Sequence, residues 1–437
     1  MSTLEKQLGS AQHVIGGPFG SKLTQKDYTA EGVPVIRGSN MVSGGRWIGG
    51  EFAFVSEEKV DADLRSNLAQ PGDIIVTQRG TLGQVAIVSD RGGFDRYVIS
   101  QSQMAVRVPQ AKADRDFVFY FLQSPQFAAY VENSTIQTGV PHINLGILRN
   151  APAVWPNRHR QTEIASVLAY LDDKIELNRR MNETLEAMAR AIFRDWFVDF
   201  GPTRAKAEGR APYLAPEIWD MFPDALDDED KPIGWEAGTT LDIAELISGG
   251  TPKTGEPAFW NGDIPWASAK DVSACREGFL VETERAISEL GLKRSSTKIV
   301  PKFSTVVIAR GATTGRYCMF GGDIAMNQTC YALRQRDNQH FFLHCWFANL
   351  VGGLVHAAHG SVFDTITTNT FKNTKALIPP DHLRSMFEVV VAPIYLRILA
   401  NIVESRTLAR TRDLLLPKLM SGEICLSDAG EMIDEVA

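Results

Sequence analysis

Three groups of residues have the types and spacing of a catalytic or metal-binding site, and the first is acidic. Asp224, followed by Glu229 and Lys231, matches a minimal nuclease pattern in which acids hold Mg²⁺ beside a lysine. These residues lie in a proline-rich acidic segment, where no strand is expected to align the carboxylates. A solvated run of charges is the preferred interpretation, and a standalone Mg²⁺-dependent nuclease stays open as an alternative.

The other two groups involve glycine and histidine. Residues 249–254 faintly resemble a phosphate-binding loop, but they lack its spacing, and Pro252 has no backbone N–H to donate. His340, His344 and Cys345 have the spacing of metal ligands on one helix face. Because no matching second pair accompanies them, a packed amphipathic helix is the simpler interpretation. We therefore expect no catalytic residues and no metal site in this chain.

Basic and amide side chains on predicted loops have the chemistry of DNA contacts. Arg79 and Arg310 each follow a predicted strand and precede a glycine-containing turn, so they either reach guanine edges and phosphates or pin their own loops. The amides of Gln101, Asn327 and Gln328 suit paired contacts with adenine, or else they satisfy strand edges. For the remaining candidates a solvated surface role is the alternative: Lys22, Arg37, Asn40, Thr81, Lys253, Lys270, Thr313, Thr314 and Arg316.

Length and charge are compatible with such a role. The 437 residues are 44% hydrophobic and 22% charged, which predicts two or more globular domains. The net charge of -7 looks wrong for a nucleic-acid binder, but the acid is concentrated at residues 220–236 and 423–437. Without those two segments the chain carries +4. The overall charge therefore does not exclude a DNA-binding surface elsewhere.

The expected location is a reducing cytoplasm. The five cysteines are widely spaced and include no Cys-x-x-Cys, which indicates free thiols. Residues 1–8 contain no apolar core of a signal peptide, and no window approaches 18 uninterrupted apolar residues. We expect neither export nor a membrane span.

Two helical segments with a common repeat organise the rest of the chain. Apolar residues recur in steps of four and three from Ile164 to Ile192, and the pattern returns 223 residues later, starting at Phe387. The average step of 3.5 is that of a coiled-coil seam, so the two segments can pair antiparallel. Asn178 and Asn401 are matched under this shift, and we predict that they help set the register.

The globular segments repeat too, so we predict an α+β fold built by internal duplication. Two globular α/β domains are separated by two long helices that form an antiparallel coiled coil. The linker is expected to be extended and to pack on the helices through Trp219 and Phe222, and Pro393 is expected to kink or divide the second spacer. The predicted segments are a first domain at 1–156, a central helical spacer at 157–200, a linker at 201–235, a second domain at 236–380, a C-terminal helical spacer at 381–425 and an acidic tail at 426–437.

The central spacer has further predicted properties. From Ile164 to Ile192 it extends over 28 residues, roughly 42 Å at about 1.5 Å per residue. One turn of B-DNA is about 34 Å, so a spacer of this length can place two domains on successive major grooves. Trp196, Phe197 and Phe200 follow it, and we predict that these aromatic side chains form a surface for a partner protein.

Four sets of short motifs follow one another along the chain. They are 17–23, 27–28 and 32–40 in the first domain, 172–178 and 193–200 in the central spacer, 248–252 and 264–266 in the second domain, and 414–424 near the end. In this order they resemble the specificity subunits of Type I restriction-modification enzymes: the first set is similar to the start of one target-recognition domain, the third to another subtype of that domain, and the other two to the central helical region and the closing segment. The similarity covers nearly the full length, and the order of the motifs, which occurs twice, is its most specific feature.

The resemblance implies a non-catalytic subunit of an adenine methyltransferase and ATP-dependent endonuclease complex. Each recognition domain would read one half of a bipartite double-stranded DNA site, and two methyltransferase subunits would dock on the helices. Those subunits would use S-adenosylmethionine, and two further subunits would use ATP and Mg²⁺ for translocation and cleavage. The chain itself would hold no cofactor, in the cytoplasm of a bacterium or archaeon. A coiled-coil scaffold that ignores DNA is the other alternative.

Overall fold

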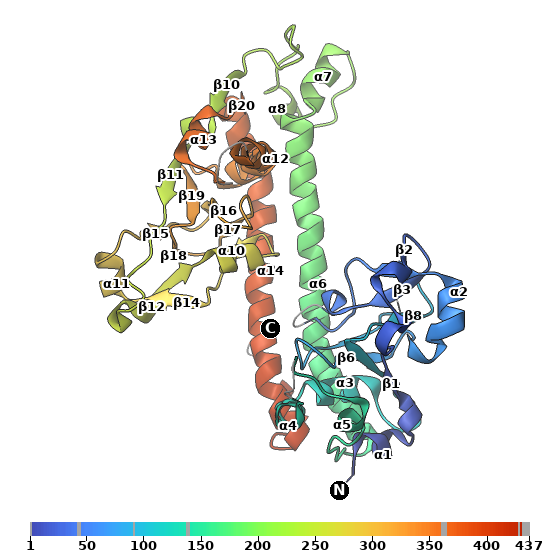
Figure 1. Ribbon diagram of the computed structural model, residues 1–437. Helices are drawn as coiled ribbons and strands as arrows, with labels where there is room; N and C mark the ends of the chain where they lie inside the picture. Colours follow the sequence, from blue (N-terminus) through green and yellow to red (C-terminus); the bar gives the residue numbers. More distant parts are fainter. Residues whose placement is uncertain are drawn as a thin grey trace. The chain divides into compact units, whose positions relative to one another are not determined.

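The computed structural model divides into two compact units, each of which contains one globular domain and one segment of each of two long helices (Figure 1). Unit 1 comprises Met1–Leu177 and Glu404–Ala437, and unit 2 comprises Asn178–Val403. The spacers predicted as separate segments are therefore shared between the units. The structure describes residues 2–41, 45–90, 92–136, 140–359, 365–426 and 429–430, so most of the predicted acidic tail lies outside the described residues.

Unit 1 contains two sheets. One is antiparallel in the order β1-β9-β6-β7, and the other has the order β2-β4-β3-β8-β5 with β3 and β8 parallel. The central strands of both sheets are rich in β-branched residues and fully buried, as expected for strands covered on both faces. The strands are β1 Val14–Gly16, β2 Tyr28–Thr29, β3 Val33–Ile36, β4 Ala53–Val55, β5 Leu68–Ala69, β6 Ile74–Thr77, β7 Val85–Ile87, β8 Tyr97–Ile99 and β9 Gln103–Val106.

Short helices surround these sheets. The apolar side of α3 packs into the same core as β6 and β9, and the N-terminal part of α6 joins it. The α-helices are α1 Leu4–Leu8, α2 Glu57–Lys59, α3 Arg115–Gln123, α4 Pro125–Ser134 and α5 Leu145–Arg149, and the shorter helical turns are η1 Ala11–His13, η2 Gly20–Lys22, η3 Gln25–Asp27, η4 Gly38–Asn40, η5 Val60–Leu64 and η6 Arg65–Asn67.

Unit 2 contains two similar sheets and a two-stranded ribbon, β10-β20. The sheets have the orders β11-β19-β16-β17-β13 and β14-β12-β18-β15. The strands are β10 Glu236–Thr239, β11 Ala244–Ser248, β12 Trp260–Ala267, β13 Phe279–Leu280, β14 Arg285–Ile287, β15 Ile299–Val300, β16 Thr305–Ile308, β17 Tyr317–Phe320, β18 Ile324–Met326, β19 Cys330–Gln335 and β20 Lys375–Ile378. The helices are α7 Gly201–Ala207, α8 Pro216–Trp219, α9 Thr240–Ile243, α10 Ala269–Ala274, α11 Glu289–Lys293, α12 His340–His359 and α13 Thr368–Asn373, with η7 Pro257–Phe259.

The strand orders confirm the predicted duplication. The order β1-β9-β6-β7 of unit 1 corresponds to β11-β19-β16-β17 of unit 2, and β4-β3-β8-β5 corresponds to β14-β12-β18-β15. The parallel pair β3 and β8 has its counterpart in the parallel pair β12 and β18. The other pairs in these matched sets are antiparallel, so both chain order and strand direction repeat.

The two long helices, α6 (Arg158–Phe197) and α14 (Asp381–Ser421), pair antiparallel as predicted (Figure 1). Within unit 2, Asn178 donates to the backbone of Asn401. Further along α6, Phe193 packs instead on Phe387, nearer the start of α14. One residue number rises as the other falls, which defines the antiparallel direction.

Two predictions about chain regularity are corrected in part. The helix α14 is continuous through Pro393, so the second spacer is not divided there, while the alternative of a kink stays a prediction; Pro393 is exposed one turn from the exposed Val389. Water can therefore reach the carbonyl group that the proline leaves without its helical partner. The segment 201–235 is not extended throughout, because it contains α7 and α8. Its Phe222 does pack on α6, with 5.3 Å between the ring centroids of Phe222 and Trp196.

Among the described residues, one helix, α14, is long and apolar enough by length and composition to cross a membrane. Of its most apolar window, 39% is buried inside the structure. The buried side of α14 includes Phe387, Val391 and Ile398, which belong to the core of unit 2. The seam with α6 and the core therefore account for much of its apolar content.

Candidate nucleic-acid interface

Three loops of unit 1 are joined by hydrogen bonds into one surface. We call them the glycine loop (residues 17–23), the amide turn (residues 100–102) and the arginine loop (residues 78–83). Nε2 of Gln101 donates to the carbonyl oxygens of Gly20 at 2.8 Å and Leu23 at 3.2 Å. The backbone N–H of Gln78 donates to Ser102 at 2.8 Å. The amide turn thus fixes both neighbouring loops.

Unit 2 repeats this arrangement with its own glycine loop (residues 249–254), amide turn (residues 327–329) and arginine loop (residues 309–316). The N–H of Ala309 donates to Thr329 at 2.8 Å, as Gln78 does to Ser102. Two isolated β-bridges also correspond, Arg79 with His142 and Arg310 with Thr365. The two surfaces therefore share backbone hydrogen bonds as well as strand order.

A glycine brings each glycine loop against its amide turn. A Cβ atom at Gly17 would lie 2.1 Å from the carbonyl oxygen of Ser100. A Cβ atom at Gly249 would lie 1.9 Å from the carbonyl oxygen of Asn327. Both distances are far below van der Waals contact with backbone, so no other residue fits without moving the turn. The two glycines occupy equivalent places in the two units.

Arginine and lysine side chains project from these loops. Arg79 and Arg310 are exposed, and neither forms an ion pair or a side-chain hydrogen bond within the described part of the chain. Lys22 and Lys253 are exposed in the glycine loops. Gln328 is exposed in the unit 2 amide turn. Each of these groups can donate hydrogen bonds to an outside partner, which is the chemistry required for phosphate and base contacts.

Of the remaining candidates, one is exposed and the others are half-buried or already bonded within the chain. Thr81 is exposed in the unit 1 arginine loop. Oγ1 of Thr314 donates to Gly311 within its own turn, and Thr313 is half-buried. The guanidinium group of Arg316 donates to the carbonyl oxygen of Ser273 at 2.9 Å. Lys270 forms an exposed ion pair with Glu284 at 2.6 Å.

The prediction that Asn40 contacts DNA is wrong. Its side chain is fully buried, and Nδ2 donates to the carbonyl oxygens of Gly49 and Glu51. Oδ1 accepts from the N–H of Arg37, whose own side chain is half-buried. An asparagine in a turn readily hydrogen-bonds the nearby backbone, and Asn40 is the last residue of the helical turn η4. Asn40 therefore holds its own loop together.

Two other amides are partly used in the same way. Oδ1 of Asn327 accepts from both the N–H and the hydroxyl of Thr329, which leaves its Nδ2 group for an outside partner. Nε2 of Gln101 is committed to the glycine loop. Both side chains therefore form hydrogen bonds within the chain, as the alternative interpretation predicted.

Of the three aromatic side chains predicted to form a partner surface, Trp196 and Phe197 are buried within the chain, whereas Phe200 is half-buried and its role stays a prediction. Trp196 is 3% exposed, Phe197 is 8% exposed, and both belong to the core of unit 2. The rings of Trp196 and Phe197 pack on Phe387 at 5.9 and 5.3 Å. The chain turns at Phe200, in the left-handed region at φ 54°, and the segment that follows covers the aromatic side chains. In the sequence, the proline-rich segment that ends at Trp235 is the feature that could have predicted this burial, because Trp235 packs on Phe200.

Three asparagines form a buried group on the seam of unit 2. Nδ2 of Asn401 donates to Oδ1 of Asn182 at 2.8 Å, and Nδ2 of Asn178 donates to the carbonyl oxygen of Asn401 at 3.5 Å. Nδ2 of Asn182 reaches the carbonyl oxygen of Ile398 at 3.4 Å. The match of Asn178 with Asn401 thus corresponds to a physical contact, and their role in setting the register stays a prediction.

The long helices carry exposed apolar side chains that the pattern of the seam does not reveal. On α14 within unit 2, Val389, Leu396 and Val403 are 68%, 48% and 51% exposed and are spaced by seven residues. On α6 within unit 1, Tyr170 and Leu177 are 55% and 53% exposed with the same spacing. A seven-residue step places each set on one side of its helix. We call these sets the α14 stripe and the α6 stripe.

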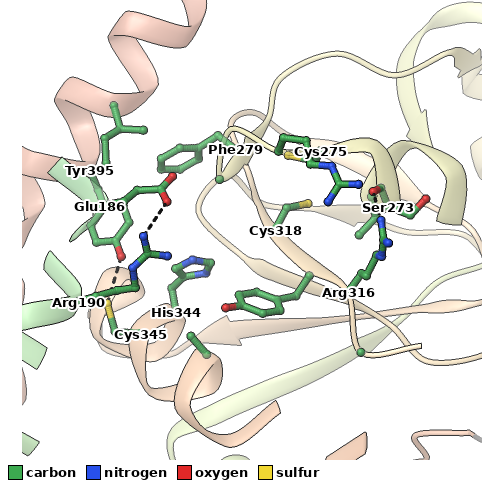
Figure 2. A pocket seen from close by; sticks show the side chains of 17 residues that line it. Glu186, Arg190, Ser273, Cys275, Phe279, Arg316, Cys318, His344, Cys345 and Tyr395 are labelled. Atoms are coloured by element: carbon green, nitrogen blue, oxygen red, sulfur yellow. Dashed lines mark hydrogen bonds and ion pairs between the residues drawn. The ribbon is translucent and has the colours of Figure 1, made fainter. Parts of the chain in front are cut away.

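One cavity in unit 2 is lined by titratable side chains, but it does not have the chemistry of an active site. Its volume is about 460 Å³, and Figure 2 shows Arg190 projecting into it beside Glu186 and His344. Burial lowers the pKa of His344 to about 4, so this imidazole is neutral, and its Nδ1 lies 3.3 Å from the hydroxyl of Thr305. Burial raises the pKa of the Cys345 thiol to about 12, which removes it as a nucleophile.

The acidic segment does not bring its carboxylates together. Asp224 pairs with Lys206 at 3.0 Å, and Asp230 pairs with Arg204. Glu229 pairs with Lys231. No group of three His, Cys, Asp or Glu side chains suited to hold a metal ion occurs in the described ranges. This arrangement favours structural ion pairs over the nuclease pattern.

Comparison with known proteins identifies similar chains over nearly the full length. A family model described as the Type I restriction modification DNA specificity domain matches residues 14–187 and 232–382. The Type I restriction enzyme MjaIX specificity subunit of Methanocaldococcus jannaschii is 24% identical over 96% of this chain and 93% of its own length. The HindI specificity subunit of Haemophilus influenzae is 26% identical, over 81% and 86% of the two chains. The crystal structure of a Type I S subunit from M. genitalium has the same fold, with a TM-score of 0.53 at 16% identity over 93% of both chains.

Proposed function

We propose, from the premise that this chain belongs to the Type I restriction-modification DNA specificity family, that each of its two units reads one half of a bipartite DNA site. The chain is a specificity subunit, which supplies sequence-specific DNA recognition to a restriction-modification complex and has no catalytic role of its own. The alternatives of a standalone nuclease and of a scaffold that ignores DNA have no support in the comparisons.

The observation that carries the proposal is the repeated three-loop surface. Each surface has an exposed arginine, Arg79 or Arg310, at the end of a buried strand, and each has an exposed lysine in the glycine loop. Positively charged donors on loops fixed by backbone hydrogen bonds suit a rigid partner with regularly spaced acceptors. We assign the two arginines to base edges or adjacent phosphates, and Lys22 and Lys253 to phosphates.

The stripes on the long helices are the proposed sites for methyltransferase subunits. An apolar row on an exposed helix face is unfavourable in water and is typical of a surface that a partner covers. The α14 stripe and the α6 stripe each offer such a row, so two methyltransferase subunits have one row apiece. Those subunits would use S-adenosylmethionine, and two restriction subunits would use ATP and Mg²⁺. The assembly would work in the cytoplasm.

The DNA-reading proposal is tested with Arg79→Ala and Arg310→Ala in the assembled complex. Each substitution is expected to weaken DNA binding about tenfold, because one charged contact to a base or phosphate is lost. Arg65→Ala is the control, because this exposed arginine of unit 1 lies outside the three-loop surface and pairs with Asp61. Equal affinities for all three variants would contradict the assignment. Replacing residues 1–156 with another recognition domain should alter one half-site only.

The docking proposal has its own test. Leu396→Asp places a charge in the α14 stripe and is expected to reduce methyltransferase binding at least tenfold in a pull-down or by calorimetry. Arg397→Asp, at an exposed position about 100° around the same helix from Leu396 and outside the α14 stripe, is the control. Binding that both variants retain in full would rule out the α14 stripe as a docking site.

A further inference from the structure

One large apolar side chain is exposed where its surroundings are polar. Phe19, in the glycine loop of unit 1, is 74% exposed, and it is the only phenylalanine among the strongly exposed apolar side chains of the described residues. Phenylalanine is ordinarily buried, and its exposure in a monomer indicates a contact surface when other features point the same way.

The loop holds Phe19 in this position. The N–H of Gly17 donates to Gln103 at 3.2 Å on one side of Phe19, and Gln101 holds the carbonyl oxygen of Gly20 on the other. The close approach of Gly17 to Ser100 leaves the backbone no room to withdraw toward the sheet. The backbone that carries the ring is therefore held in place, so little backbone entropy is lost when the ring meets a partner.

The neighbours of Phe19 define the kind of partner. Lys22 is exposed three residues away, and the exposed Gln101 side chain is bonded to the next residue in the loop. In unit 2, Gly249 is equivalent to Gly17, so the position of Phe19 is occupied by Thr251, which is half-buried. The aromatic ring thus belongs to one of the two DNA-reading surfaces and has no counterpart in the other.

We propose that Phe19 contacts the C5-methyl group of a thymine in the half-site read by unit 1, an inference that rests on the proposed DNA-reading function. The edges of the bases carry hydrogen-bond donors and acceptors, and the thymine methyl group is the apolar feature among them. A phenyl ring cannot donate or accept a conventional hydrogen bond. Its complementary target on a base edge is that methyl group, so Phe19 is a specificity-determining residue.

The experiment measures the affinity of the complex for DNA duplexes from which one thymine methyl group at a time has been removed. The target sequence is first mapped from methylated adenines in host DNA, and each thymine of the site is then replaced singly by deoxyuridine, which lacks the methyl group. The complete complex is titrated with each duplex. One deoxyuridine in the unit 1 half-site is expected to weaken binding about fourfold, the equivalent of one buried methyl-sized group.

Phe19→Ala provides the decisive comparison. In this variant the same deoxyuridine is expected to cause no further loss, whereas Phe19→Leu should retain part of the effect because leucine still offers apolar atoms. Deoxyuridine in the unit 2 half-site should affect both proteins equally. The inference is overturned if no position distinguishes the wild type from Phe19→Ala, or if 2-aminopurine fluorescence shows that Phe19 unstacks a base instead. If the wild-type complex did not bind the mapped site specifically, that result would instead count against the proposed function.

Discussion

Unit 1 and unit 2 share strand order and three-loop surfaces, and each joins its recognition domain to the long helices through an apolar core, but unit 1 adds a buried ion pair where unit 2 has a cluster of aromatic side chains. In unit 1, Asp172 of α6 pairs with Arg412 of α14 at 2.6 Å and accepts a hydrogen bond from Tyr120 of α3 at 2.6 Å. In unit 2, Trp196 and Phe197 pack among other aromatic side chains. The duplicated units thus share a backbone arrangement, whereas the side chains that connect each domain to the long helices differ.

This difference has an energetic meaning. A buried ion pair depends on every partner, because a charge left alone in the interior is strongly unfavourable. Burial and the neighbouring Asp172 raise the pKa of Tyr120, so its hydroxyl stays protonated and continues to donate. An aromatic cluster distributes its contribution over many contacts and over a large apolar area. The two units should therefore respond differently to matched substitutions.

The largest expected effect is in unit 2. Trp196→Ala should lower the free energy of unfolding of unit 2 by about 3–5 kcal/mol, because it leaves a cavity in the aromatic core. Hydrogen exchange followed by mass spectrometry would report each unit separately. Val198→Ala, at an exposed position close by, is the control, with an expected change below about 0.5 kcal/mol. Equal loss of protection in unit 1 would show that the units do not have separate cores.

The matching change in unit 1 is Asp172→Asn. It removes the charge that compensates Arg412 and should destabilise unit 1 by about 3 kcal/mol. Asp413→Asn is a stringent control, because Asp413 pairs with the same arginine at 2.8 Å but is 65% exposed. Its expected effect is at most about 1 kcal/mol. Chemical denaturation would measure the free energy of unfolding of both variants. Similar losses in the two would mean that the buried and the exposed carboxylate contribute equally to stability.

The start of the main helix in each domain differs as well, and this difference predicts a pH effect. Asp114 caps its own helix α3, whereas the N–H groups of Phe341 and Phe342 in α12 donate to Glu388 of α14. Burial raises the pKa of Glu388 to about 7, above its ordinary value of 4.5. Between these values the folded state binds more protons than the unfolded state, so this group's contribution to stability falls as pH rises.

Glu388→Gln should remove that dependence. The free energy of unfolding of the variant, minus that of the wild type, is expected to rise by about 2 kcal/mol between pH 4.5 and 7 and then level off. Thermal unfolding at a series of pH values would measure it. A difference that does not change with pH would mean that Glu388 titrates near its ordinary pKa.

The smallest expected effect concerns the loops. Gln101→Ala removes two hydrogen bonds to the glycine loop of unit 1 and should raise amide exchange in residues 17–23, with a local loss of about 1 kcal/mol. The Gln328→Ala change, at an exposed amide in the unit 2 turn, should leave loop exchange there unchanged. Unchanged exchange in both would indicate that Gly17 and its backbone contacts alone position the loop.

The fold was largely predictable because it rests on patterns that recur in the chain. Two copies of a seam, and two copies of a strand followed by Arg-Gly, reveal duplication without any knowledge of packing. Asn178 and Asn401 are matched under the same shift, and the two residues contact each other. Local periodicity records which residues share a face, so predictions of this kind succeed.

The candidate site was less predictable because exposure depends on contacts made by distant segments. Asn40 has a side chain suited to DNA, but its neighbouring backbone occupies it. Trp196 and Phe197 have the composition of a docking surface, but they are covered once the chain turns at Phe200. Phe19 was not predicted as a contact, because its exposure depends on Gly17 meeting Ser100 across the fold.

The tight approach of Gly17 and Gly249 to their amide turns bears on how such a protein acquires new targets. Each glycine is irreplaceable without displacing backbone, whereas the residues two positions later, Phe19 and Thr251, differ already between the two halves of one chain. The residue that fixes the loop backbone and the residue that differs between the two loops are therefore separate positions. If Phe19 reads a base as proposed, a single substitution at residue 19 would change that DNA contact and leave the backbone contact of Gly17 in place.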